Sequence, residues 1–292
     1  MAAKPFMSDA PVAQACVACG GEELSLVYQA PEFAVLRCKA CTMAQAPDLG
    51  VPQAGSSKVA SSSTPDEKLD EYRDTFEQMK ALCLRSMDLR IPFFEKLLGR
   101  PLRSVCEVGC ANGVGYFAFK QRGIDWIGLD TNPRWIEFGR RHDIPIVARD
   151  LADVEQHFDL IYTQQVLEHI AEPLPFLEQA RERLAPGGIL HVAVPNHSGF
   201  TALVRRMLPK MSPTRYGFIE YPYHMRAYNR KSLGALLRRA GFRDIEVRAI
   251  EHTDLCWGEW DTHSVSRRNR LIFGAGGKVG LGTLLFAYAR KP

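Results

Sequence analysis

A glycine turn between two strand-like runs is the feature that most constrains this chain. Residues 105–115, VCEVGCANGVG, run from apolar residues through an acid into a turn of small residues, and then into an apolar helix start. At Gly109 and Gly113 the backbone can pass close to a ligand, because few side chains stand in the way. A second strand-like run, 126–129, is followed by Asp130. Strand, glycine turn, helix, strand and acid together indicate a nucleoside-binding α/β unit.

Past Pro101 the chain alternates between short apolar runs and helical patterns. Strands are expected near residues 103–108, 125–130, 144–148, 158–163, 188–194, 243–250 and 283–290. Asn229 is the expected N-cap of one helix and Gly241 its stop signal. Helices are expected near residues 67–98, 114–122, 133–141, 173–185 and 230–240. The alternation predicts an α/β fold with a parallel sheet covered on both faces.

Composition and charge exclude several classes of protein. Of the 292 residues, 46% are hydrophobic and 24% are charged, which is ordinary for a globular chain with a real core. The net charge of +4 is mild, so no nucleic-acid partner is expected. The sequence has no apolar run of the roughly 18 residues that a membrane span needs and no signal-peptide pattern at its N-terminus. We therefore expect a cytoplasmic protein.

Four of the eight cysteines form two close pairs near the N-terminus. Cys16 and Cys19 have the spacing CxxC, Cys38 and Cys41 repeat it, and eighteen residues separate the pairs. Two such pairs predict a zinc site with four thiolate ligands, and a site with four protein ligands is structural. Unrelated reduced thiols are the alternative. The predicted organisation is a tail (1–15), a zinc-binding module (16–47), a linker (48–66) and a larger domain (67–292).

The glycine turn also distinguishes between two kinds of nucleoside cofactor. A dinucleotide fingerprint needs glycine at its first, third and sixth positions, where this chain has Gly109, Ala111 and Val114. The pattern Glu107-x-Gly109-x-Ala111-x-Gly113 instead resembles the first motif of class I S-adenosylmethionine (SAM)-dependent methyltransferases, with alanine where that family usually has glycine. An NAD-dependent sugar-modifying enzyme on a related fold is the alternative, which the missing glycine disfavours.

Later segments resemble the same family, in the family's order. Asp130 matches the acid after the second strand, 149–151 the segment that meets the adenine, and 158–169 the fourth motif. The loop 184–190 and the late signature at 223–242 extend the resemblance over roughly residues 70–292. It implies a Rossmann-like, mostly parallel sheet of seven strands and SAM as the cofactor. The cofactor-binding residues that it implies are Glu107, Gly109, Cys110, Ala111, Gly113, Asp130, Thr131, Asp150, Leu151 and Gln164.

The order of the domains narrows this resemblance. A four-cysteine block ahead of the class I fold is similar to methyltransferases of deoxysugar, surface-polysaccharide and natural-product pathways. The resemblance implies a small-molecule acceptor and an N-terminal block that helps to enclose it. A non-catalytic zinc-ribbon protein that keeps the fold as a binding platform is the alternative from another class. We expect a substrate lid at 198–228, and favour it over membrane contact by the basic apolar stretch 203–211.

Three histidines are candidates for a catalytic base, which methyl transfer needs only where the acceptor must lose a proton. His224 is the first candidate, because it follows the fifth strand among three tyrosines and a neutral imidazole can accept a proton near pH 7. His169, after the fourth strand, is the second candidate, and His197 is the third. Alternatively, these side chains only bind backbone groups or shape the pocket.

Overall fold

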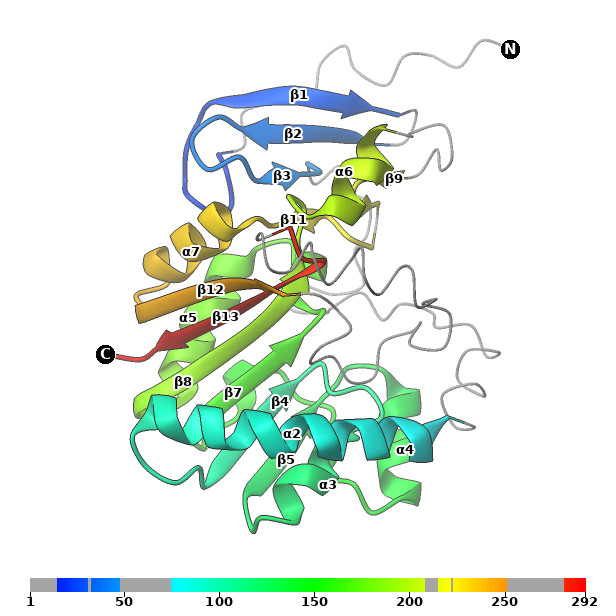
Figure 1. The fold of residues 1–292 in the computed structure, drawn as a ribbon, viewed down its shortest axis with the longest axis vertical. Coiled ribbons are helices and arrows are strands. Elements are labelled where there is room, and N and C mark those ends of the chain that lie inside the picture. The colour runs from blue at the N-terminus through cyan, green and yellow to red at the C-terminus, as the bar shows by residue number, and fades with distance from the viewer. Residues whose placement is uncertain (1–14, 31–32, 48–74, 208–214, 222, 251–280) are drawn as a thin grey trace.

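The computed structural model describes residues 15–30, 33–47, 75–207, 215–221, 223–250 and 281–292. Its central sheet consists of β4 (Ser104–Val108), β5 (Asp125–Leu129), β6 (Ile146–Val147), β7 (Phe158–Gln164), β8 (Leu184–Pro195), β12 (Arg243–Ile250) and β13 (Leu284–Arg290). The strand order is β12-β13-β8-β7-β4-β5-β6, and Figure 1 labels the strands from β12 to β5 in this order. Only β13 runs antiparallel to its neighbours, β8 and β12, while the other pairs are parallel. The predicted seven-stranded, mostly parallel sheet is confirmed.

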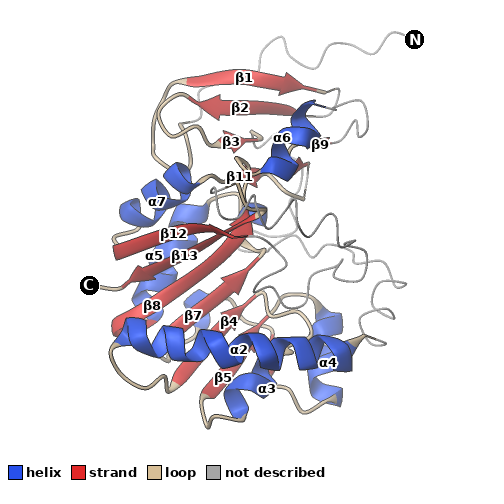
Figure 2. Cartoon of the chain, viewed as in Figure 1, coloured by secondary structure: helices blue, strands red, loops and turns tan. Residues whose placement is uncertain are grey.

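Helices cover both faces of this sheet (Figure 2). They are α2 (Phe76–Leu98), α3 (Gly115–Lys120), α4 (Pro133–Arg141), α5 (Pro173–Arg183) and α7 (Arg230–Arg239). Two apolar cores result, one shared by α2, α3 and the sheet, and one shared by α5, α7 and the sheet. In β13, Phe286 belongs to the first core, whereas Leu285 and Ala287 belong to the second. Successive strand side chains point to opposite faces, so an apolar run is buried on both sides.

Local sequence signals set the ends of α7 where they were predicted. The Asn229 side chain accepts a hydrogen bond from the Ser232 amide, and the Ser232 hydroxyl accepts one from the Asn229 amide. This reciprocal capping box satisfies backbone donors that a helix start leaves unpaired. At the other end, Gly241 adopts a φ of 82°, which stops the helix.

The start of β8 differs from the prediction. The strand begins at Leu184, four residues before the expected start at 188. Its pairing with β7 shifts between Phe158 and Leu160, where β8 forms a bulge that contains Gly187 and Gly188. A Cβ on Gly188 would lie 2.8 Å from the Ala185 carbonyl oxygen, so the bulge depends on glycine.

A second sheet is built mainly by the N-terminal cysteine block. Its order is β1 (Leu24–Gln29), β2 (Ala34–Cys38), β3 (Ala44–Gln45) and β11 (Arg226–Ala227). The fourth strand therefore comes from the segment just before α7, far along the chain (Figure 1). Most of the predicted tail, the whole predicted linker and the first turns of the predicted helix at 67–98 lie outside the described residues.

Residues 208–214 and 222 of the predicted lid lie outside the described residues, and its described part contributes three short elements between β8 and β11. They are α6 (Phe200–Met207) and a hairpin of β9 (Arg215–Tyr216) and β10 (Ile219–Glu220). The Tyr216 ring stacks on Tyr28 of the cysteine block at 5.2 Å between centroids. Ile219 and Ala227 share a small apolar cluster with residues of β2 and β3. Within the described parts of the chain, no helix is both long and apolar enough to cross a membrane.

Candidate functional site

The glycine turn connects β4 to α3 at the carboxyl edge of the central sheet. Gly109 and Gly113 have φ angles of 70° and 68°, and Ala111 between them has a φ of 47°. A Cβ on Gly109 would lie 2.4 Å from Val166 Cγ2, so the turn packs directly against the loop that follows β7. Ala111 takes a left-handed backbone without being glycine, which costs roughly 1–2 kcal/mol. Alanine at position 111, where the family usually has glycine, therefore fits this turn with a strained backbone.

Asp130 holds this turn from the end of β5. Its Oδ2 accepts a hydrogen bond from the Ala111 amide and its Oδ1 accepts one from the Asn132 amide, both at 2.9 Å. Burial raises the pKa of Asp130, and these amide donors oppose the shift. A carboxylate oxygen has two lone pairs, so each oxygen can accept one further hydrogen bond. The carboxylate is thus suited to a vicinal diol such as that of a ribose.

The other predicted cofactor residues lie at the ends of neighbouring strands. Thr131 follows β5, Asp150 precedes the short helix η1 (Leu151–Asp153) after β6, and Gln164 ends β7. Parallel strands present their carboxyl ends at one edge of the sheet, where ligands of open α/β sheets bind. The side chains of Cys110 and Leu151 are buried in the two apolar cores. These two residues can therefore offer a cofactor only backbone groups.

Glu107 belongs to β4, and its side chain reaches the start of α3 beneath the turn. Its Oε2 accepts a hydrogen bond from Trp126 Nε1 at 2.9 Å, and a Cβ on Gly115 would lie 2.4 Å from the same oxygen. Burial raises the pKa of Glu107 to about 8, although the Trp126 bond and the charge of Arg90 act in the opposite direction. A cation bound nearby would lower that pKa again. Contact with the ammonium group of a cofactor would therefore release the proton from the Glu107 carboxyl group.

The structure brings together the two histidines that the sequence ranked first. His169 ends η2 (Leu167–His169), the turn after β7, and His224 lies just before β11. Their ring centroids are 4.5 Å apart in an edge-to-face arrangement. Burial and the neighbouring His224 lower the pKa of His169 to about 4, so this ring is neutral at pH 7.

Glu168 joins the histidine pair, and sequence reasoning gave it no role. Its side chain is buried, and one potential ligand atom from each of Glu168, His169 and His224 lies within 4.8 Å of the others. The only signal in the sequence is the Glu-His dipeptide itself. The third candidate, His197, lies apart with its ring against Gly217, and burial lowers its pKa to about 3.

The four predicted zinc ligands meet in the N-terminal block. Cys16 Sγ and Cys41 Sγ are 3.5 Å apart, as are Cys19 Sγ and Cys38 Sγ, and all four sulfurs lie within 4.8 Å of one another. Tetrahedral zinc with bonds of about 2.3 Å needs sulfur atoms about 3.8 Å apart, so this cluster fits the ion. The contact between Cys16 and Cys41 lowers the pKa of Cys16 and raises the pKa of Cys41, so without an ion the two thiols share a proton.

The two CxxC turns share one backbone conformation. In each, the amide four residues after the first cysteine donates to that cysteine's carbonyl group, at 2.8 Å from Gly20 and 2.9 Å from Thr42. Gly20 and Thr42 are equivalent positions, with φ angles of 75° and 60°. The sequence predicts a positive φ at Gly20 but not at Thr42, because a β-branched residue such as threonine rarely adopts this angle.

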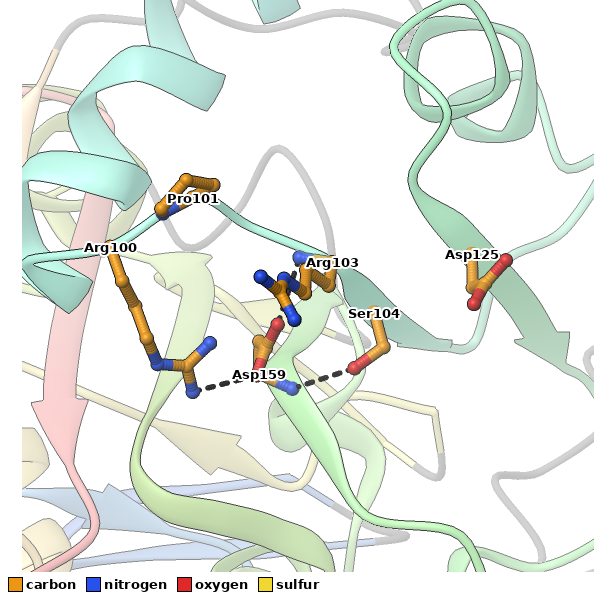
Figure 3. Close-up of a pocket in the computed structure, with 6 residues that line it drawn as sticks. All are labelled: Arg100, Pro101, Arg103, Ser104, Asp125 and Asp159. Atoms are coloured by element: carbon orange, nitrogen blue, oxygen red, sulfur yellow. Dashed lines mark hydrogen bonds and ion pairs between the residues drawn. The ribbon is translucent and has the colours of Figure 1, made fainter.

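A separate hollow of about 500 Å³ opens at the opposite edge of the sheet (Figure 3). There Arg100 Nη2 lies 2.7 Å from Asp159 Oδ1, and the Asp159 amide donates to Ser104 Oγ at 3.1 Å. These residues mark the amino ends of β4 and β7, away from the glycine turn. The hollow is lined by Arg100, Pro101, Arg103, Ser104, Asp125 and Asp159.

The strand order and the turn held by an acid define a Rossmann-like α/β protein with a nucleoside site at the carboxyl edge of its sheet. The family described as "Methyltransferase domain" matches residues 73–247, and the chain belongs to this family. It is a SAM-dependent methyltransferase. This membership favours the sequence prediction over the NAD-dependent and non-catalytic alternatives.

Known proteins resemble the chain in sequence and in fold. A ubiquinone biosynthesis O-methyltransferase of Cereibacter sphaeroides is 28% identical over 198 residues, which cover 62% of this chain and 74% of that protein. A SAM-dependent methyltransferase from Archaeoglobus fulgidus has a TM-score of 0.51 at 19% identity, covering 75% of this chain and 100% of the other. The plantazolicin methyltransferase BpumL, solved with SAH, has a TM-score of 0.52 at 16% identity, covering 81% and 94%. These structures share the fold.

Proposed function

We propose that this methyltransferase acts in the cytoplasm on a small-molecule acceptor, a sugar, polysaccharide or natural-product intermediate. The observation that carries the proposal is the meeting of His169 and His224 beside the loop that packs on the glycine turn. The order of the cysteine block and the catalytic fold supports the acceptor class. The relatives include enzymes named for a quinone and for a natural product, and both of these are small molecules.

The cofactor would lie across the carboxyl ends of β4, β5 and β7. Asp130 would accept hydrogen bonds from the ribose hydroxyls, and the turn from Gly109 to Gly113 would leave room for the methionine part. Glu107 would hold the ammonium group, directly or through a water molecule. When bound, SAM supplies a methyl group on a sulfonium, which an acceptor attacks in line with the carbon–sulfur bond.

The protein's main contribution to this step is orientation. Holding the nucleophile in line with the methyl group can contribute roughly 7–11 kcal/mol to catalysis. The His169 and His224 pair then removes the proton that the acceptor must lose, with His224 as the first candidate. The predicted lid, represented by α6 and the β9–β10 hairpin, would exclude water from the acceptor.

Calorimetric titration with S-adenosylhomocysteine tests the cofactor site. We expect one molecule to bind per chain, and Asp130→Asn to weaken binding by roughly 10- to 100-fold, since hydrogen bonds to charged groups contribute about 1.5–3 kcal/mol. Asp153→Asn, an exposed acid in η1, is the matched control and should bind as the wild type does. Binding of NAD in place of S-adenosylhomocysteine would refute the proposal.

Two further measurements test the acceptor step and the zinc site. With an acceptor found by screening sugar nucleotides and phenolic intermediates, His224→Gln should lose turnover while keeping cofactor affinity. Near-normal turnover would exclude His224 as the proton acceptor. Elemental analysis should find one zinc ion per chain, lost in Cys16→Ser/Cys41→Ser but kept in Cys83→Ser, because Cys83 is buried in the other core.

A further inference from the structure

We infer that Glu168, His169 and His224 bind a divalent transition-metal ion at the acceptor side of the cofactor turn. The inference rests on the proposed function and deepens it, because such an ion selects acceptors that react through oxygen. This site is separate from the cysteine cluster and differs from it in chemistry, with two imidazoles and one carboxylate in place of four thiolates.

Three side chains from two segments converge here. Glu168 and His169 come from η2, and His224 comes from the segment that follows the β9–β10 hairpin. One ligand atom from each residue lies within 4.8 Å of the others. A first-row ion with bonds of about 2.1 Å holds its ligand atoms roughly 3–4 Å apart, so small rotations of the rings complete the site.

The backbone orients both imidazoles as metal ligands need. His169 Nδ1 lies 2.9 Å from the Tyr223 carbonyl oxygen, and His224 Nδ1 lies 3.3 Å from the Phe218 carbonyl oxygen. A carbonyl oxygen can only accept, so each contact places a hydrogen on Nδ1, and in the neutral ring Nε2 is then the nitrogen that can bind a metal. Metal-binding histidines typically donate their other ring nitrogen to a carbonyl group in this way.

A backbone contact fixes the two segments to each other. The Met225 amide donates to the Glu168 carbonyl oxygen at 3.0 Å, so the residue after His224 is hydrogen-bonded to the residue before His169. Glu168 is 1% exposed and is the one acid among the three residues. Two imidazoles and one carboxylate suit Zn²⁺, Fe²⁺ or Mn²⁺, and leave coordination positions open for another ligand.

The position of the site indicates what the open coordination positions would bind. Val166, which packs on Gly109, immediately precedes η2, so the three ligands lie next to the cofactor turn. An acceptor hydroxyl bound to the ion would lose its proton near neutral pH, because a bound cation lowers the pKa of oxygen acids. With the ion bound, both imidazoles act as ligands, so the proton passes to solvent and the ion replaces the histidine base of the ion-free site. The oxygen then attacks the methyl carbon as the carbon–sulfur bond breaks, and the bonding electrons pass to sulfur. The ion keeps its oxidation state.

Mn²⁺ is the probe that tests the inference, because its signal in electron paramagnetic resonance reports free ion and it prefers nitrogen and oxygen to thiolate ligands. The full-length protein with zinc in its cysteine cluster should bind one Mn²⁺ per chain. Glu168→Gln and His224→Gln should each weaken binding on the order of 100-fold or more. The exposed His157, which lies beside the amino end of β7, provides the control His157→Gln, which should bind normally.

Two results would overturn the inference: no Mn²⁺ binding by the wild type at millimolar concentration, or unchanged binding by His224→Gln. His224 is partly exposed, so its variant should fold even if that of the buried Glu168 does not. Titration of the same samples with S-adenosylhomocysteine separates the two proposals. If the cofactor product binds and Mn²⁺ does not, only the metal site is refuted, whereas failure to bind the product refutes the proposed function.

Discussion

Arg226 provides the most direct test of how the N-terminal block is joined to the catalytic fold. Its side chain is buried and spans two segments. Nε and Nη2 donate to the Ala171 carbonyl oxygen at 3.1 and 2.7 Å, and Nη1 donates to the Ala46 carbonyl oxygen at 2.5 Å. Ala46 follows β3 in the cysteine block, and Ala171 follows η2. One guanidinium group thus connects the cysteine block to the loop that carries Glu168 and His169.

Arg226→Met removes these donors and leaves an apolar side chain of similar length. The Ala46 carbonyl group then loses its partner in a buried place, which costs about 1–3 kcal/mol. The Ala171 carbonyl group loses its partners at a half-buried position that water can reach, which costs about 1 kcal/mol or less. The free energy of unfolding should therefore fall by about 1–4 kcal/mol. Urea denaturation followed by far-ultraviolet circular dichroism measures this change.

Arg183→Met is the matched control. Arg183 Nη2 also donates to a carbonyl oxygen, that of Ala152 at 2.7 Å, but at an exposed position where water can replace it. We expect a loss of at most about 1 kcal/mol for this variant. If Arg226→Met costs no more than Arg183→Met, the guanidinium group does not join the cysteine block to the catalytic fold.

Three further predictions follow from buried groups and from the lid. The pKa of Glu107 is about 8 in the folded protein and 4.5 in an unfolded chain, so between these pH values the folded state keeps a proton that the unfolded state has lost. The free energy of unfolding should therefore fall from about pH 4.5 to pH 8, by at most about 1.4 kcal/mol per pH unit. Denaturation measured across that range should show that Glu107→Gln removes this dependence. Arg90 Nη2 lies 2.7 Å from His191 Nε2 in the core. Arg90→Met and His191→Leu should each lower the melting temperature, because each leaves one buried polar group without its partner, whereas the double variant should recover at least the wild-type value. Additive losses in the double variant would show that the two side chains do not act as a pair. α6 exposes Phe200, Leu203 and Met207. If α6 is part of a lid, the protein should not float with anionic vesicles in a flotation assay. Flotation with the vesicles would instead indicate that this segment binds membranes.

Several features could be predicted from the sequence because they depend on neighbouring residues. The capping box of α7 needs only Asn229 and Ser232, and the glycine turn needs only small residues after an apolar run. The cysteine spacing similarly predicts a cluster, and the four sulfurs indeed lie together. Sequence patterns located all seven strands of the central sheet. Most of them are apolar runs, because burial on both faces requires such runs whatever their partners are, and the edge strand β12 alternates apolar with polar residues.

Other features depend on contacts between distant segments, which no local pattern encodes. β11 pairs with β3, so the cysteine block and the segment after His224 share one sheet. The meeting of Glu168 and His169 with His224 likewise follows from the packing of η2 against β11. The sequence alone determined which chemical groups the chain carries and the class of its fold. Only the tertiary structure decided which of those groups meet, because side chains far apart in the chain are brought together by burial and strand pairing.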